Sequence, residues 1–218
     1  RLYPKIIARS LVKQLYFVRH GQTEWNAAHR VQGQWNSDLN KLGRAQAEIN
    51  GQLLSDLNIE ALFASPLDRT RQTAEIINRQ LELPITFDER IKEWDCGDWS
   101  GYLYDEVRKK WSEEWQAYQA DRFNYRGPNC ENVPDMMERA RPFLDEILAH
   151  PANTIAIVSH GMIGKIMVSM LLEFDERSTL DLGQPNDVVF KLSLDNNNIE
   201  VSHFVRGKGP IAGHQVES

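Results

Sequence analysis

Two histidines, His20 and His160, occupy equivalent places in two similar segments of the chain. Each follows a run of apolar residues, Leu15–Val18 in one case and Ile155–Val158 in the other, and each precedes a glycine. A short apolar run predicts a buried strand, and a glycine permits a sharp turn beside a ligand. Because ligands of open α/β sheets bind at the carboxyl ends of the strands, we expect the two imidazoles to meet in one site.

Arginines accompany these histidines, which favours phosphate over a metal ion as the ligand. Arg19 directly precedes His20, and Arg69 lies in the segment Ser65–Ala74, where a predicted strand gives way to a helix. An imidazole can bind a metal, move a proton or act as a nucleophile. A guanidinium repels a metal cation but binds phosphate through its planar fork. We therefore expect phosphate, and not a metal ion, as the ligand of this site, and we expect no cofactor.

The residues after His20 add neutral hydrogen-bond donors to this site. Gly21, Thr23 and Asn26 offer backbone N–H groups, a hydroxyl and an amide. Donors of this kind can surround the oxygens of a phosphate group. We expect all three residues to bind phosphate.

Composition limits the classes of protein to which the chain can belong. The 218 residues suffice for one α/β domain with a sizeable core, and the formal net charge is −6. This acidic balance argues against nucleic-acid binding, which favours a basic face, but a local group of arginines can still bind a small anion. Apolar runs all fall short of the ~20 residues that a membrane-spanning helix needs, so we expect no membrane contact.

Cysteine usage indicates a reducing compartment. Cys96 and Cys130 form neither a CxxC pair nor a dense disulfide framework. We therefore expect a cytoplasmic protein and leave open whether the two cysteines form a bridge. A homodimer is likewise left open.

The sequence alternates between strand and helix patterns. Strands are expected at residues 15–19, 61–64, 85–87 and 154–158, with a hairpin of 188–194 and 199–204 around residues 195–198. Helices are expected at 41–57, capped by Asn40, and at 68–81, 102–120, 133–150 and 162–172. This alternation predicts a three-layer α/β/α fold with a mostly parallel central sheet.

We expect a single domain at residues 15–205. Residues 1–14 lack the apolar stretch of a secretory signal and are interpreted as an N-terminal arm or leader, and residues 206–218 as a mobile C-terminal tail. Residues 97–133 show no strand pattern, which indicates a lid-like insertion over the site. The aromatic residues Trp94, Trp99, Trp111 and Trp115 are interpreted as core or lid side chains, with a wall for the substrate as the alternative.

Four segments in order resemble the signature motifs of the histidine phosphatase superfamily, also called the phosphoglycerate mutase-like family. They are Val18–Asn26 with Arg19-His20-Gly21, Ser65–Ala74 with Arg69, Glu93 followed by Gly97, Trp99 and Gly101, and Ser159-His160-Gly161. Together they cover most of residues 15–172. The resemblance implies a phosphoglycerate mutase-like fold.

The resemblance also implies a role for each of these side chains. His20 would attack phosphorus and form a phosphohistidine. Arg19, Arg69 and His160 would hold the phosphoryl oxygens. Glu93 would protonate the departing alcohol and then activate the water that cleaves the phosphohistidine. For this attack His20 must be neutral, and its flanking arginines disfavour the protonated form.

Neighbouring residues compete for two of these roles. The family pattern favours Arg69 over Arg71, which is interpreted as a surface residue of the helix. It likewise favours Glu93 over Asp95 and Asp98 as the acid.

Four more residues are expected to contact the substrate. Gln32 stands where relatives place a polar residue near the phosphate, and Gly161 follows the second histidine. Arg126 and Glu131 lie around the place where related phosphatases carry a Gly-Gly-Glu-Ser-like segment, of which only the glutamate is kept here.

The resemblance leaves a choice between hydrolysis and mutase chemistry. Dedicated mutases carry a tyrosine three residues after the acid and a lysine eleven after it, where this chain has Cys96 and Tyr104. These departures favour a metal-independent phosphomonoester hydrolase that acts on a small phosphorylated metabolite. The alternative is a cofactor-dependent phosphoglycerate mutase. A third hypothesis, a phospho-binding or regulatory module without turnover, conflicts with the complete set of motif residues.

Overall fold

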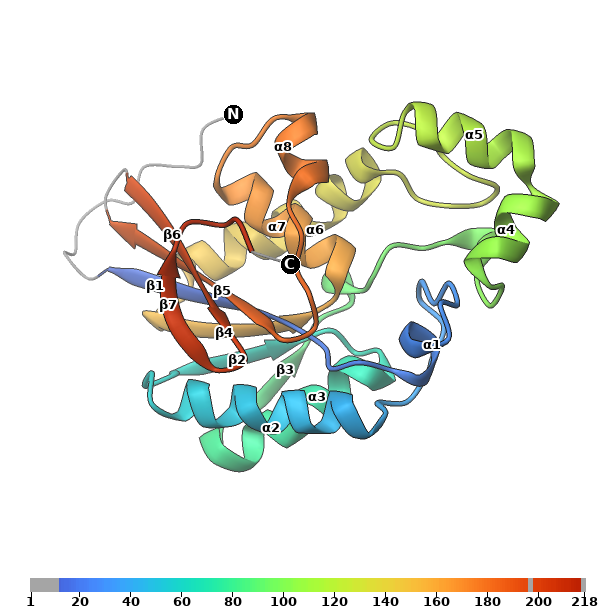
Figure 1. The fold of residues 1–218 in the computed structure, drawn as a ribbon. Helices are drawn as coiled ribbons and strands as arrows, with labels where there is room; N and C mark the ends of the chain where they lie inside the picture. The colour runs from blue at the N-terminus through green and yellow to red at the C-terminus, as the bar shows by residue number, and fades with distance from the viewer. Residues whose placement is uncertain (1–11, 196–197, 217–218) are drawn as a thin grey trace.

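The chain folds around one mixed sheet of seven strands, which lie in the order β3-β2-β4-β1-β5-β6-β7 (Figure 1). A computed structural model describes residues 12–195 and 198–216. The strands are β1 (Lys13–Arg19), β2 (Ala61–Ala64), β3 (Ile85–Phe87), β4 (Thr154–Ser159), β5 (Val188–Asp195), β6 (Asn198–Val205) and β7 (Lys208–Ala212). Neighbours from β3 to β1 pair in parallel, and those from β1 to β7 pair antiparallel.

The central strand β1 is buried on both faces. Leu15 and Phe17 belong to one apolar cluster, whereas Tyr16 and Val18 belong to another on the opposite face. Successive side chains of a strand point to opposite faces, so an apolar run without polar residues serves two cores at once. The predicted strand is thereby confirmed.

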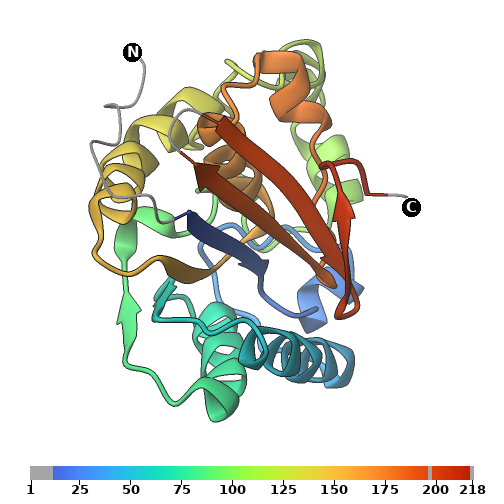
Figure 2. The same cartoon turned by 90° about the vertical axis from the view of Figure 1, so that its left-hand side faces the viewer.

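Helices cover both faces of the sheet, which confirms the expected three-layer α/β fold (Figure 2). On one face lie α2 (Lys41–Ser55) and α3 (Asp68–Leu81), and on the other α6 (Val133–Ala149) and α7 (Gly161–Leu171), with α8 (Glu176–Asp181) packed on α7. Asn40 caps α2 as predicted, because its side chain accepts a hydrogen bond from the Gly43 N–H at 2.9 Å.

The segment between β3 and α6 lies beyond the carboxyl ends of the parallel strands, next to the short helix α1 (Glu24–Ala27) (Figure 1). It contains two 3-10 turns, η1 (Glu89–Ile91) and η2 (Gly97–Trp99), and two helices, α4 (Tyr104–Lys110) and α5 (Ser112–Ala120). The single helix expected at 102–120 is wrong, because Trp111 at φ −122° and ψ 52° breaks it.

The aromatic side chains of this lid segment form a small core of their own. Trp99 is 1% exposed and packs against Trp115 at 5.7 Å between ring centroids. Tyr118, Cys96 and Cys130 belong to the same buried cluster. Both cysteines are free.

The two ends of the domain differ from the expectation. Lys13 and Gln14 belong to β1, so the ordered domain begins before residue 15. The tail after residue 205 is not mobile where it is described, since β7 pairs with β6. Arg206 and Gly207 both have positive φ, as in the tight turns that join antiparallel strands, and this turn signal was missed. Residues 1–11, 196–197 and 217–218 lie outside the described part, including most of the expected arm and the middle of the predicted turn.

Within the described ranges, each helix is too short or too polar to cross a membrane.

Candidate active site

The parallel pairing of β1 with β4 brings the two histidines together. Arg19 lies opposite Ser159 in the register, and the next residue along each strand is a histidine. The N–H of His20 donates to the Ser159 carbonyl at 2.9 Å. The rings of His20 and His160 lie 5.3 Å apart between centroids at 64°. The expectation that both imidazoles meet at one edge of the sheet is confirmed.

His20 presents the lone pair of Nε2 for chemistry. Its Nδ1 lies 2.8 Å from the Gly21 carbonyl oxygen, and a carbonyl only accepts, so Nδ1 carries the proton. The Nε2 atom accepts a hydrogen bond from the Arg69 Nε–H at 3.2 Å. Burial, followed by the charges of Arg69 and Arg19, holds the pKa of His20 well below its usual value. The imidazole is therefore neutral at physiological pH, as a nucleophile must be.

Arg69 is fixed as a rigid donor beside His20. It lies at the start of α3, is 1% exposed, and donates to the carbonyls of Trp35 at 2.8 Å and Gly33 at 2.6 Å. Burial lowers its pKa to about 10, which leaves the guanidinium charged at neutral pH. Arg71, its competitor in the sequence, stacks on the Phe87 ring at 3.9 Å and is absent from the cavity lining.

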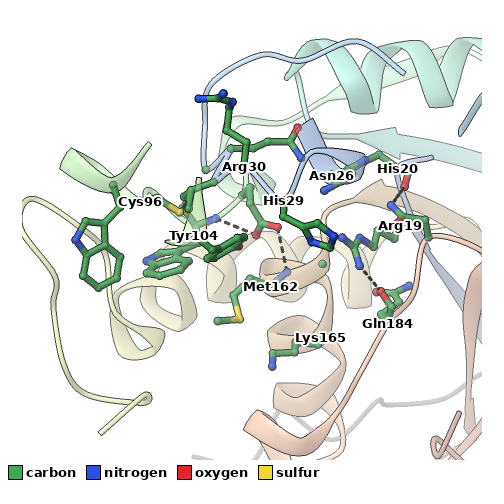
Figure 3. Close-up of a pocket in the computed structure, with 18 of the residues that line it drawn as sticks. Arg19, His20, Asn26, His29, Arg30, Cys96, Tyr104, Met162, Lys165 and Gln184 are labelled. Atoms are coloured by element: carbon green, nitrogen blue, oxygen red, sulfur yellow. Dashed lines mark hydrogen bonds between the residues drawn. The ribbon is translucent and has the colours of Figure 1, made fainter. Parts of the chain in front are cut away.

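Arg19 lies on the other side of His20 and packs against the start of α7. Its Nη1 donates to the Gln184 carbonyl at 2.8 Å, and its buried Nε has no partner (Figure 3). A Cβ on Gly161 would lie 3.0 Å from the Arg19 Cζ. A larger residue at position 161 would therefore require the guanidinium to shift by a few tenths of an ångström.

Glu93 is held at the N-terminus of α7. Its Oε2 accepts from the Met162 N–H at 3.1 Å, and its Oε1 accepts from the Ile163 N–H at 3.0 Å. A third bond reaches Oε1 from the Trp94 N–H at 2.9 Å. The positive end of the helix and these donors fix the position of the carboxyl group on the wall of the cavity.

His160 is fully buried behind His20. Its Nε2 lies 2.7 Å from the Ser65 hydroxyl, and its Nδ1 is buried without a partner. Burial, with Arg69 next, lowers the pKa of His160 well below the ordinary histidine value. Nδ1 is therefore a buried polar atom without a partner among the described residues, and His160 is not part of the cavity lining.

The loop after His20 shapes the site more than it lines it. A Cβ on Gly21 would lie 2.1 Å from the Gly43 carbonyl oxygen, so this turn tolerates only glycine. Thr23 caps α1 and donates its hydroxyl to the Gln32 Oε1 at 3.0 Å. Asn26 and Gln32 reach the cavity, whereas Gly21 and Thr23 support them from behind.

These side chains surround a cavity of about 620 Å³ (Figure 3). Its lining includes seven of the expected site residues, namely Arg19, His20, Asn26, Gln32, Arg69, Glu93 and Gly161. Aromatic residues of the lid segment complete it, namely Trp94, Trp99, Tyr104, Trp115 and Tyr118. The lid therefore forms one wall of the site. Among the described residues, His, Cys, Asp and Glu side chains form no group of three that could hold a metal ion.

Two expected substrate contacts lie elsewhere. Arg126 is exposed and donates to Asp135 at 2.7 Å, because the loop turns its side chain toward α6. Glu131 forms a two-bond ion pair with Arg139, at 2.9 and 2.8 Å, and lies outside the cavity lining. Arg139 in turn donates to the Glu93 carbonyl at 3.3 Å. Glu131 thus supports the segment that carries the acid instead of touching a substrate.

The sequence motifs did not predict several residues that line the cavity. Asn186 donates to the His20 carbonyl at 2.7 Å, and the Gln184 carbonyl receives Arg19. Both belong to the loop before β5, which reaches the site because β5 pairs with β1. Lys165 lies one turn beyond Met162 on α7 and also lines the cavity. Its spacing of four residues from Gly161 places both on one face of the helix, and this spacing could have predicted it.

Comparisons with known proteins agree with this geometry. The sequence profile described as "Histidine phosphatase superfamily (branch 1)" matches residues 15–206. A "Probable phosphoglycerate mutase" of Erwinia tasmaniensis is 40% identical over 161 residues, which are 73% of this chain and 74% of that protein. Phosphoserine phosphatase 1 of Hydrogenobacter thermophilus is 33% identical over 194 residues, covering 83% of this chain and 92% of the relative.

Solved structures give the same assignment. The YhfR protein of Bacillus stearothermophilus superposes with a TM-score of 0.79 at 28% identity, covering 90% of this chain and 97% of that one. A mycobacterial glucosyl-3-phosphoglycerate phosphatase in complex with VO3 gives a TM-score of 0.77 at 26% identity, covering 88% and 98%. The sequence profile, the identities and the site geometry together establish that the chain belongs to the histidine phosphatase superfamily.

Proposed function

We propose that this enzyme hydrolyses small phosphomonoesters through a phosphohistidine on His20. The observation that carries the proposal is the Nε2 lone pair of a neutral, buried imidazole, placed between two arginines and facing the cavity that Glu93 also lines. Phosphoryl transfer depends mainly on positioning and on stabilising charge, which these groups supply.

The first step transfers the phosphoryl group to the enzyme. The Nε2 lone pair of His20 attacks phosphorus, and the bond between phosphorus and the alcohol oxygen breaks. Glu93, in its acid form, gives its proton to that oxygen. Arg19, Arg69 and the Nδ1 side of His160 stabilise the phosphoryl oxygens as their charge redistributes.

The second step returns the enzyme to its starting state. Glu93, now a carboxylate, accepts a proton from a water molecule whose oxygen attacks phosphorus. The N–P bond breaks, its electron pair returns to Nε2 of His20, and inorganic phosphate leaves. Glu93 is again protonated for the next cycle.

The test is hydrolysis of p-nitrophenyl phosphate together with trapping of the intermediate. Wild-type protein should release phosphate and carry an acid-labile, base-stable phosphoryl group after a rapid quench. His20→Asn should lose both signals, whereas His214→Asn, outside the cavity, should keep them. Phosphate release by the His20→Asn variant at the wild-type rate would refute the mechanism. EDTA should leave the rate unchanged, because arginines stabilise the phosphoryl group.

Mutase activity is the second candidate, favoured by the 40% identity to a probable phosphoglycerate mutase. A mutase must return the phosphoryl group to a second hydroxyl before water takes it. Interconversion of 2- and 3-phosphoglycerate, measured beside release of free phosphate, separates the two activities. We expect release of phosphate to exceed interconversion.

A further inference from the structure

The cavity carries more positive charge than one phosphoryl group requires. Among the described residues that line it, the basic side chains are Arg19, Arg30, Arg69, Arg122 and Lys165, and the one carboxylate is that of Glu93. This cationic lining stands in a chain whose net charge is −6. A cavity lined by one sign of charge concentrates ligands of the opposite sign. Two of the five flank the reactive imidazole, which leaves three to explain.

Arg30 has a structural partner. Its guanidinium donates to the Gly101 carbonyl and lies 5.6 Å from the centroid of the Trp25 ring. These contacts connect the loop after α1 to the lid. Arg122 and Lys165 are therefore the two basic side chains whose place in the cavity lining is still to be explained.

Lys165 is an ammonium group in a mostly buried position. It is 9% exposed, and one of its three donors reaches the Leu180 carbonyl at 3.1 Å. Within the part of the chain that the structure describes, no carboxylate lies within ion-pair distance of it. Figure 3 shows its side chain beside that of Met162, on the face of α7 that borders the cavity. A buried ammonium with unused donors is costly unless a ligand compensates it.

Arg122 approaches the same region from the lid. It follows α5, is exposed at the rim, and its guanidinium lies 5.9 Å from the centroid of the Tyr118 ring. Both side chains line the same cavity, and the charge of Arg122 contributes to the lowered pKa of Lys165. Two cations that line one cavity, one from α7 and one from the lid, form an anion site once a negative group binds between them.

We propose that Lys165 and Arg122 bind a second anionic group on the alcohol part of the substrate. The enzyme then selects phosphomonoesters that carry a further carboxylate or phosphate. This inference rests on the proposed function and specifies its substrate class. The cavity of about 620 Å³ exceeds what a phosphoryl group alone occupies, and so leaves room for such an alcohol.

Matched pairs of substrates test the proposal on wild-type enzyme. O-phosphoserine and phosphoethanolamine differ only by a carboxylate, and fructose 1,6-bisphosphate and fructose 6-phosphate differ by a second phosphate. We expect kcat/KM to be at least tenfold higher for the more anionic member of one pair. The pair that shows the preference identifies the second anion as carboxylate or phosphate. Equal values within both pairs would overturn the proposal.

Two variants assign the preference to these side chains. Lys165→Met and Arg122→Gln should each raise KM for the anionic substrate about tenfold and leave p-nitrophenyl phosphate within about twofold. The matched control is Arg177→Gln, which removes a charge from the exposed face of the neighbouring α8. If Lys165→Met does not fold, Arg122→Gln still decides, because its side chain lies at the exposed rim. Equal losses for both members of a pair would make the residues structural and overturn the assignment.

The dependence on pH separates a binding lysine from a structural one. Burial lowers the pKa of Lys165 to about 8, with Arg122 acting in the same direction and Glu93 and Asp181 opposing it. The ammonium is lost as the pH rises through this value. The preference for the anionic substrate should therefore decline between pH 7 and 9.5 in wild-type enzyme and stay flat in Lys165→Met. A flat wild-type ratio would contradict the role of Lys165.

Failure of this inference is distinguishable from failure of the proposed function. Absence of phosphate release from every substrate, p-nitrophenyl phosphate included, would overturn the hydrolase itself. Normal hydrolysis of p-nitrophenyl phosphate without any preference for anionic alcohols would overturn only the second anion site.

Discussion

Arg69 donates a hydrogen bond from Nε to the Nε2 atom of His20 across 3.2 Å. Its two other nitrogens are held by the carbonyls of Gly33 and Trp35, so the guanidinium cannot turn away from the imidazole. The positive charge is therefore already placed beside the nitrogen that would receive a phosphoryl group. Donors that need no reorganisation during the reaction are the ones that stabilise a transition state most.

Replacing this guanidinium should be costly even when the charge is kept. Arg69→Lys removes the rigid fork, and we expect kcat/KM for p-nitrophenyl phosphate to fall about 100-fold or more. Steady-state kinetics measure the loss. The control Arg71→Lys changes a neighbouring side chain that stacks on Phe87, and it should stay within about threefold of wild type. Similar losses in both variants would remove the special role of Arg69.

Glu93→Gln should act according to the leaving group. An amide cannot supply the proton, and a proton matters most when the departing oxygen is strongly basic. We expect the rate for an alkyl phosphate to fall about 10- to 100-fold more than the rate for p-nitrophenyl phosphate. Rates for a series of phosphomonoesters give the slope of the logarithm of the rate against the pKa of the leaving alcohol. Asp98→Asn is the control, and an identical slope in Glu93→Gln and wild type would contradict general acid catalysis.

Glu131→Gln should also slow hydrolysis of alkyl phosphates, although residue 131 does not contact the substrate. Glu131 holds Arg139, which holds the carbonyl of Glu93, so the variant loosens the acid. We expect stability to fall by about 1–3 kcal/mol and kcat for alkyl phosphates to fall severalfold, with KM unchanged. Urea unfolding and leaving-group kinetics measure the two effects. Arg126→Gln should change neither, and a raised KM in Glu131→Gln would instead indicate a substrate contact.

The two buried histidines should make stability depend on pH. The pKa values of His20 and His160 in the folded protein lie well below the ordinary value of 6.5, so below pH 6.5 the unfolded chain binds more protons than the folded one. Their contribution is complete above pH 6.5 and decreases as the pH falls below it. Between pH 6.5 and 5.5, each histidine should lower the free energy of unfolding by about 1 kcal/mol.

Urea unfolding at these two pH values measures that decrease. The double variant with His20→Asn and His160→Asn lacks both groups and should lose about 2 kcal/mol less than wild type over the same interval. If the free energy of unfolding decreased equally with pH in the wild type and the double variant, the histidines would titrate alike in the folded and unfolded chains.

The sequence predicted the centre of the site because short motifs follow predictable strands. The apolar runs that precede His20 and His160 indicated buried strands, and parallel strands end at the same edge of a sheet. Arg69 and Glu93 could be selected over their neighbours because the family motifs distinguish them. The structure adds the atoms, such as the proton on Nδ1 of His20 and the N–H groups that receive Glu93.

The lid and the residues that support the site from behind could not be predicted in this way. Helix propensity runs through residues 102–120, but the backbone leaves the helical conformation at Trp111, which packs against the aromatic cluster of the lid. Arg126 and Glu131 occupied plausible places in the sequence, but loop geometry turns them toward Asp135 and Arg139. Contacts between residues far apart in the chain decide such orientations, and no local pattern encodes them.

By itself, the sequence determined the α/β fold and the chemistry of the site, since buried strands and motif residues are local features. Tertiary structure alone decided how the cavity is completed. It brings Gln184 and Asn186 to the histidines through the pairing of β5 with β1, and it places Lys165 of α7 and Arg122 of the lid on the wall of one cavity. Long-range packing closes the cavity, and so the groups that recognise the alcohol part of the substrate appear only in the folded chain.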